Sequence, residues 1–328
     1  MPFFIKSVLS SERTVVAGEQ VTYDLPVNPL SYIDLRLTAV QSALNTLVDP
    51  TDFLGYITSV EVLWRGSSIV SVSLRDLAMT AGVLTGYWPD LQNHGNLANQ
   101  RISMVFKIPF GRKLFWTSEI LPPVRRGELQ LRLTYATPLT DAASLIEHIE
   151  TLEVPDATPS RFLKYTTLPK TPTAAGDHDV DLPIGNPLVG ALLFSTTVPA
   201  GTVETTSIDA VKLLVDNVEF FYPLSRWEEV HADFLRRSNG ALARIWNHQH
   251  MYDPTLVAAN QTTDRAQGAT YDLRQYGYLD FDPLMDPEMG YSLVTAGRAR
   301  VNLRISADDV AAIRVIPIEV IPIAPRGA

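Results

Sequence analysis

Short segments in which apolar and polar residues alternate recur along the whole chain, with turn residues between them. Leu131-Arg132-Leu133-Thr134 is one such segment, and Leu303-Arg304-Ile305-Ser306 is another. Because successive side chains of a strand point to opposite faces of a sheet, this alternation predicts strands with one buried face. The chain also contains 23 prolines, which would interrupt long helices. The pattern therefore predicts an all-β protein built from short strands.

The chain also resembles itself, and its two halves look like versions of one plan. Residues 57–66 align without a gap with residues 208–217, and each segment is a strand pattern that runs into a turn, Arg-Gly in the first and Asp-Asn in the second. Residues 21–30 and 178–188 share an Asp-Leu-Pro sequence and open a strand pattern in both halves. Repetition on this scale predicts tandem copies of one domain.

Each half is predicted to contain one helix after the repeated strand and turn. In the first half, Ser73 to Asp76 has the pattern of a helix start, and apolar residues at helical spacing continue until Gly82. In the second half, Ser225-Arg226-Trp227-Glu228 has the pattern of a capping box, in which serine and glutamate side chains satisfy free backbone N–H groups. This helix is expected to end at Ser238-Asn239-Gly240.

Residues 141–152 resemble a capped helix when they are taken alone. Their counterpart, residues 314–320, contains β-branched residues and an internal proline, Pro317. These features favour a strand in both places, at a sheet edge or a bulge.

The expected fold is two tandem eight-stranded antiparallel jelly rolls, a double jelly roll, each with one short helix inserted between strands. We divide the chain into an N-terminal arm (1–17), a first jelly roll (18–158), a linker (159–176), a second jelly roll (177–324) and a C-terminal tail (325–328). The linker is placed where Pro, Thr and Ala accumulate between the two halves.

Composition excludes several classes of protein. The 328 residues are 46% hydrophobic and include 12 Phe, 12 Tyr and 5 Trp, too many aromatics for a disordered chain. The absence of cysteine excludes disulfides, thiolate metal sites and cysteine nucleophiles. A net charge of -9 opposes direct binding to nucleic acid, and residues 1–10 contain one Lys and no Arg. Neither a secretory signal nor an apolar run long enough to span a membrane is recognised.

The search for chemistry finds no catalytic motif and one weak metal candidate. Asp280, Asp282 and Asp286, near Glu288, could bind a hard cation or could simply form a polar loop. A structural calcium ion is thus the one cofactor left open. The aspartates of residues 177–181 would share one face of a strand, which favours a solvated face over a calcium site.

Two further groups of residues can be interpreted either as ligand-binding residues or as ordinary packing and loop residues. His248 and His250 could face a ligand from one side of a strand, but packing or loop histidines are the simpler interpretation. Trp88, in a predicted loop, could stack on a sugar ring, whereas Trp64 and Trp227 read as core or interface residues. The apolar start Phe3-Phe4-Ile5 could anchor to a neighbouring subunit or to a membrane, and we favour the neighbour.

Three segments resemble major capsid proteins of the adenovirus and membrane-containing tailless bacteriophage lineage. They are residues 60–84, residues 102–111 with their Ile-Pro-Phe turn, and residues 120–133, in which a Leu-Pro loop leads into a strongly alternating strand. The resemblance covers both halves in architecture, from about residue 18 to 322, but it departs at residues 281–284, where Phe-Asp-Pro-Leu replaces the Ile-Pro-Phe turn.

The resemblance implies a structural protein without catalytic residues, the major capsid protein of an icosahedral virus with a bacterial host. It implies homotrimers that act as pseudo-hexameric capsomers, contacts with neighbouring trimers and with minor capsid or vertex proteins, and in many relatives an internal membrane beneath the shell. The protein would be made in the host cytoplasm and located in the virion. A different class remains open from the residues alone, a tandem jelly-roll protein that binds carbohydrate or processes glycosides, which would require two carboxylates in an aromatic cleft.

Overall fold

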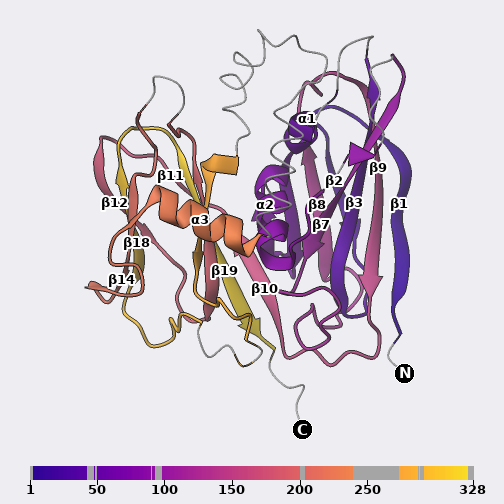
Figure 1. Ribbon diagram of the computed structural model, residues 1–328. Coiled ribbons are helices and arrows are strands. Elements are labelled where there is room, and N and C mark those ends of the chain that lie inside the picture. The colour runs from indigo at the N-terminus through magenta and orange to yellow at the C-terminus, as the bar shows by residue number, and fades with distance from the viewer. Residues whose placement is uncertain are drawn as a thin grey trace. The chain divides into compact units, whose positions relative to one another are not determined.

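A computed structural model describes residues 3–42, 48, 50–89, 91–92, 98–199, 204–238, 273–286, 288 and 292–323. The chain divides into two compact units (Figure 1). The first unit contains residues 1–166 and 321–328, and the second contains residues 167–320.

The first unit is made of strands with two helices inserted between them. Its strands are β1 (Ile5–Val15), β2 (Gln20–Asp24), β3 (Leu30–Gln41), β4 (Ile57–Trp64), β5 (Ser67–Val72), β6 (Leu91–Gln92), β7 (Arg101–Pro109), β8 (Leu129–Tyr135), β9 (Ala142–Glu153) and β10 (Arg161–Thr166), and its helices are α1 (Pro50–Gly55) and α2 (Leu74–Thr85). One sheet has the order β1-β9-β3-β7-β6. The other has the order β10-β5-β4-β8-β2, with β10 parallel to β5.

Alternation along the strands builds the core of this unit. In β8, Leu129, Leu131, Leu133 and Tyr135 are buried, while the residues between them are half-buried. Strand β7 alternates in the same way. Helix α2 lies against β7 and buries almost its whole length. The alternating segments noted in the sequence are therefore strands with one face in the core, as predicted.

The second unit repeats this plan. Its elements are β11 (Leu168–Lys170), β12 (Gly176–Asp181), β13 (Leu188–Ser195), β14 (Ala210–Val215), β15 (Val218–Glu219), β16 (Ser225–Arg226), α3 (Trp227–Arg237), the 3-10 helix η2 (Leu273–Gln275), β17 (Tyr276–Asp280), β18 (Val301–Ala307) and β19 (Ile313–Pro322). Strand β13 pairs with β17 and β19, and β18 pairs with β12 and β14. Every residue of β13 is buried, which explains why its sequence is apolar rather than alternating.

Strand pairing confirms that the two units are copies of one fold. In the first unit, β3 pairs with β7 and β9, and β8 pairs with β2 and β4. The second unit has the same pairs in β13 with β17 and β19, and in β18 with β12 and β14. The turns repeat as well, because Arg65-Gly66 and Asp216-Asn217 all have positive φ angles and end matching strands.

Individual hydrogen bonds repeat at the same places. The Asn28 side chain donates to Glu153 at 2.7 Å, and the Asn186 side chain donates to Glu319 at 3.1 Å. Beside them, the backbone N–H of Val154 donates to Pro29, and that of Val320 donates to Pro187. These matched contacts confirm the double jelly roll predicted from the sequence repeat.

The sequence of residues 281–284 differs from the Ile-Pro-Phe turn of the first half, but the structure at this position is the same in both units. The Phe110 N–H of the Ile-Pro-Phe turn donates to Ser31 at 3.2 Å, and the Phe281 N–H donates to Val189 at 3.1 Å, one residue after the matched Leu30 and Leu188. Both phenylalanines are fully buried. The buried ring and its backbone contact are thus kept although the surrounding sequence differs.

The helices differ in detail from the expectation. Ser73 caps α2 by accepting from the Asp76 N–H at 3.1 Å, as predicted, but α2 continues through Gly82 to a left-handed cap at Gly86. Helix α3 begins one residue later than expected, with Arg226 at the cap and its N–H donating to Glu229. Helix α1 makes a second helix in the first unit, so the expectation of one helix per half was wrong there.

The predicted N-terminal arm and the predicted linker both contain paired strands. Residues 5–15 of the predicted N-terminal arm form β1, which pairs along its length with β9. The predicted linker, residues 159–176, contains β10 and β11, each paired within its own unit, and the boundary between the units falls at Thr166 and Thr167. Pro169 is the middle residue of β11 and lies opposite Arg314, as a proline can in a short strand at a sheet edge. The C-terminal tail, 325–328, lies outside the described residues.

Candidate assembly surfaces and candidate ion sites

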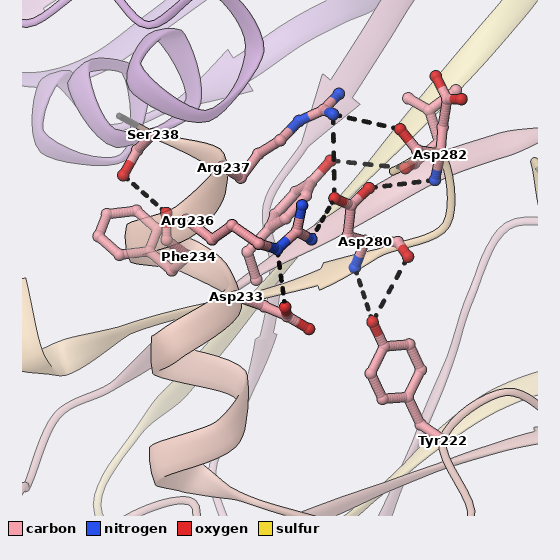
Figure 2. Close-up of polar contacts among 10 residues, drawn as sticks. Tyr222, Asp233, Phe234, Arg236, Arg237, Ser238, Asp280 and Asp282 are labelled. Carbon is pink, nitrogen blue, oxygen red and sulfur yellow. Dashed lines mark hydrogen bonds and ion pairs between the residues drawn. The ribbon is translucent and has the colours of Figure 1, made fainter. Parts of the chain in front are cut away.

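Asp280, the first of the metal candidates, lies in a network of arginines (Figure 2). It ends β17, and its side chain is 1% exposed. Arg236 Nη2, from the last turn of α3, lies 2.8 Å from Asp280 Oδ2, and Arg237 Nη1 lies 3.9 Å from the same oxygen. The negative charge of Asp280 is thus balanced by two cations of the same chain.

The other two candidates organise the loop that follows β17. The Asp282 N–H donates to Asp280 Oδ1 at 3.1 Å, the Asp286 N–H to Asp282 Oδ1 at 3.1 Å, and the Glu288 N–H to Asp286 Oδ1 at 2.9 Å. Arg237 also donates to the Asp282 backbone carbonyl at 3.2 Å. Within the described residues, no group of three or more His, Asp or Glu side chains is arranged to hold a metal ion. A structural calcium ion remains a prediction to be tested.

Tyr222, in the loop between β15 and β16, is hydrogen-bonded to the backbone of Asp280. Its hydroxyl accepts from the Asp280 N–H at 3.0 Å and lies 3.4 Å from the Asp280 carbonyl, to which it donates (Figure 2). Burial raises the pKa of Tyr222 to about 12, so the hydroxyl keeps its proton for this bond.

The aspartates of β12 lie on one strand face, as predicted. Asp179 accepts a bidentate contact from Arg304 at 2.8 and 3.2 Å, and Asp181 accepts from Arg300 at 2.7 Å. Both arginines lie on or beside the neighbouring strand β18. The hydrogen bonds from Arg304 lower the pKa of Asp179. The face is a ladder of exposed or half-exposed ion pairs.

A buried ion pair in the loop after β7 was not predicted from the sequence. Arg112 and Glu119 are both fully buried, and Arg112 Nη2 lies 2.7 Å from Glu119 Oε2. Arg161 Nε, on β10, donates to the same oxygen at 2.9 Å. Gly111 makes the turn possible, since a Cβ there would lie 2.1 Å from the Glu119 carbonyl oxygen. The sequence gives no short-range signal for this contact between Glu119 and Arg161.

The tryptophans that the structure describes are packed. Trp64 contacts Phe162 edge-on at 5.3 Å, and the Trp227 N–H donates to the Arg274 carbonyl at 2.9 Å. Trp88 is half-buried against Gly82 of α2, where a Cβ would lie 2.9 Å from its ring. This contact occupies part of the ring that was considered for sugar stacking. His248 and His250 lie outside the described residues.

A groove opens on the first unit beside Trp64. Its volume is about 680 Å³, and its apolar walls include Trp64, Pro122, Phe162 and Pro322. Among the described residues that line it, Glu128 is the one carboxylate, whereas a glycosidase needs two. A hydrogen bond from the Arg125 backbone N–H lowers the pKa of Glu128. We call this feature the first-unit groove.

Two clusters of large apolar side chains are exposed. Phe3 and Phe4 are 52% and 61% exposed, and Phe4 contacts the exposed Phe115 at 5.8 Å. On the second unit, residues 218–224, which include β15 and run up to β16, expose four apolar side chains, and we call this segment the aromatic knob. Its exposed apolar residues are Val218, Phe220, Phe221 and Leu224. Exposed clusters of this kind commonly mark interaction surfaces.

Comparison with known proteins finds matches in fold but none in sequence. No protein-family model matches the chain, and no curated protein matches it in sequence. Solved structures do match over nearly the whole chain. The major capsid protein P2 of bacteriophage PM2 matches with a TM-score of 0.62 at 14% identity, and the match covers 99% of this chain and 100% of that protein.

Viruses from other sources contain matching proteins. The MCP of STIV (Sulfolobus Turreted Icosahedral Virus) matches with a TM-score of 0.66 at 12% identity, covering 98% of this chain and 97% of that one. The Faustovirus major capsid protein matches with a TM-score of 0.51 at 8% identity, covering 98% and 90%. The chain therefore has the double jelly-roll fold of viral major capsid proteins, in agreement with the resemblance stated from its sequence.

Proposed function

We propose that this protein is the major capsid protein of an icosahedral virus and that it assembles as homotrimers that tile the shell. The observation that carries this proposal is the full-length match to capsid proteins, in which both chains are covered almost completely. A shared domain would match only in part, whereas here the whole duplicated architecture is common to both. The carbohydrate-active alternative finds no support among the matching structures.

The surface of the chain supports a role in association. Only 19% of its residues are charged, and large apolar side chains are exposed on each unit. Subunits that assemble cover such side chains against their neighbours. Three chains with two jelly rolls each would give a block of six lobes, and a heterologous contact between unlike units would close this ring.

The proposed location is the virion, after synthesis in the host cytoplasm. Partners would be further copies of the chain, minor capsid or vertex proteins and, beneath the shell, an internal membrane. No helix among the described residues is long and apolar enough to cross a membrane. With a net charge of -9, the shell wall would repel nucleic acid, so we propose no direct contact with the genome.

The mass of the purified protein in solution tests the proposal. Light scattering coupled to size exclusion should give three times the chain mass of 36.3 kDa, and negative-stain images should show particles with a hexagonal outline. A protein that remains monomeric at every concentration at which it stays soluble, or that hydrolyses a polysaccharide as a monomer, would refute the coat function.

A further inference from the structure

The aromatic knob is exposed yet firmly held. Val218, Phe220, Phe221 and Leu224 are 68%, 44%, 56% and 51% exposed. Behind them, the Phe220 N–H donates to the Leu213 carbonyl at 2.9 Å, which ties the segment to β14. The Tyr222 ring packs on the buried Phe281 at 6.1 Å, and the Tyr222 hydroxyl is bonded to the backbone of Asp280 (Figure 2).

The backbone of the knob is also held in an unusual conformation. Phe221 has a φ of 61°, in the left-handed region that bulky residues rarely adopt. Its ring contacts Phe220 edge-on at 4.6 Å. A strained residue that persists in a braced loop, with two aromatic rings kept at the surface, is typical of a binding element. A preorganised element loses little conformational entropy when a partner covers it.

The first-unit groove has the complementary chemistry. Its apolar walls are Trp64, Pro122, Phe162 and Pro322, and its volume of about 680 Å³ lies within the roughly 300–1,000 Å³ of sites that enclose drug-sized groups. This volume is larger than that of two phenyl rings.

The charges beside the groove and the knob are opposite in sign. Arg65 and Arg125 line the groove and are both exposed, and because Glu128 pairs with Arg65 at 3.3 Å, Arg125 is the positive charge left in excess among the lining residues. Near the knob, Glu219 pairs with Lys212 at 3.4 Å and Asp209 pairs with Arg226, which leaves the exposed Glu228 and Glu229 as the excess negative charge. Opposite charges around an apolar contact favour a single orientation of docking.

We propose that the aromatic knob of one copy docks into the first-unit groove of the next copy. This inference rests on the proposed homotrimer and names the contact that closes it. Because knob and groove are different surfaces on different units, the contact is heterologous, and three such contacts form a closed ring. The acidic residues near the knob favour this partner over an anionic membrane surface, which attracts basic segments.

Cross-linking tests the contact directly, since the chain has no cysteine of its own. Phe221→Cys places a thiol on the knob, and Val124→Cys places one in the groove. The double variant, treated with a short bis-maleimide, should give covalent trimers on a denaturing gel. Each single variant should stay at the chain mass, because the proposed contact places Phe221 of one copy beside Val124 of the next and not beside another Phe221.

A second variant removes the apolar contact. Phe220→Ser with Phe221→Ser should convert the trimer to monomer with its circular dichroism spectrum unchanged. Val310→Ser is the matched control, since Val310 is 57% exposed in the same unit but outside the knob, and this variant should remain trimeric. If the serine variant does not fold, the cross-linking result decides the question.

The outcomes distinguish this contact from the proposed function. A wild-type trimer whose double-cysteine variant does not cross-link would overturn the knob–groove contact and leave the coat function standing. A wild-type protein that is always monomeric would overturn the coat function. If the serine variant remains trimeric but loses binding to phosphatidylcholine vesicles that the wild type binds, the knob contacts lipid and the proposed contact is wrong.

Discussion

Replacement of Glu119 by glutamine should destabilise the first unit strongly. Both Glu119 and Arg112 are fully buried, and Glu119 accepts from the Arg112 side chain at 2.7 Å and from Arg161 at 2.9 Å. It also accepts from the Arg112 backbone N–H at 2.8 Å. Glu119→Gln removes the negative charge that the buried Arg112 guanidinium and the Arg161 guanidinium both contact. Breaking a buried pair in this way costs about 3–5 kcal/mol.

The loss should be visible as a shift in thermal unfolding. For a domain of this size, each kcal/mol lowers the melting temperature by roughly 2–4 °C, so the expected decrease is roughly 6–20 °C. Scanning calorimetry of the purified protein measures it. The control is Glu128→Gln, which removes an equivalent carboxylate from a surface pair with Arg65 at 3.3 Å and should melt close to the wild type.

A double replacement separates the lost charge from lost packing. Arg112→Met with Glu119→Leu removes both fully buried charges and leaves Arg161, whose side chain is 17% exposed, so its melting temperature should lie above that of Glu119→Gln. If Glu119→Gln melts within the range of the Glu128→Gln control, the argument from burial is refuted, because loss of the Glu119 charge then costs no more than loss of a surface carboxylate.

Three further predictions follow from other contacts. Arg304 holds the pKa of Asp179 below the usual value of about 4, so the pair stabilises the fold above that pH, and the contribution is lost as the pH falls through the lowered pKa. In Asp179→Asn, the melting temperature should therefore fall less steeply with decreasing acid pH than in the wild type, as measured by thermal melts at a series of pH values. Chelation with EDTA should leave melting temperature and particle mass unchanged, because Arg236 and Arg237 already balance Asp280; a decrease that calcium restores would show a structural ion. In Gly190→Ala, the added Cβ would lie 2.0 Å from the Tyr278 hydroxyl oxygen, and such overpacking lowers the free energy of unfolding by about 1–3 kcal/mol. The midpoint of urea unfolding should therefore fall, and an unchanged midpoint would contradict this crowding.

The sequence predicts the repeated parts of the fold because their signals are local. Alternation in β8 and β18, and the turns at Arg65-Gly66 and Asp216-Asn217, are each contained in a few neighbouring residues. The strand at residues 142–153 shows the value of the repeat. Its own pattern resembles a helix, and the comparison with residues 314–320 gives the correct strand β9.

The errors arise where distant residues decide the local structure. Gly82 reads as the end of a helix, but Trp88 packs on it, and α2 continues for another turn to Gly86. Ser225 has the pattern of a cap, but it belongs to β16 and pairs with Val211 of β14, so α3 begins one residue later.

The candidate sites show the same division. Hydrogen bonds link Asp280, Asp282 and Asp286 in turn along the loop, but the sequence cannot show that Arg236 and Arg237 contact Asp280 from 44 and 43 residues earlier in the chain. The aromatic knob was missed for a related reason. Phe220 and Phe221 read as core residues in any hydrophobicity pattern, and only the fold exposes them.

The edge strand β1 has features that prevent sheets of different molecules from pairing when the protein is concentrated. Among the described strands, β1 pairs only with β9, so one of its two edges offers free backbone groups. Its register shifts between Val8 and Ser10 and again between Ser10 and Arg13, and Glu12 has a φ of 52°. Because of these irregularities, a strand of another molecule cannot form a continuous ladder of hydrogen bonds with the edge of β1. Lateral fusion of sheets between molecules is thereby discouraged, and recognition is left to side chains, which can be specific and reversible.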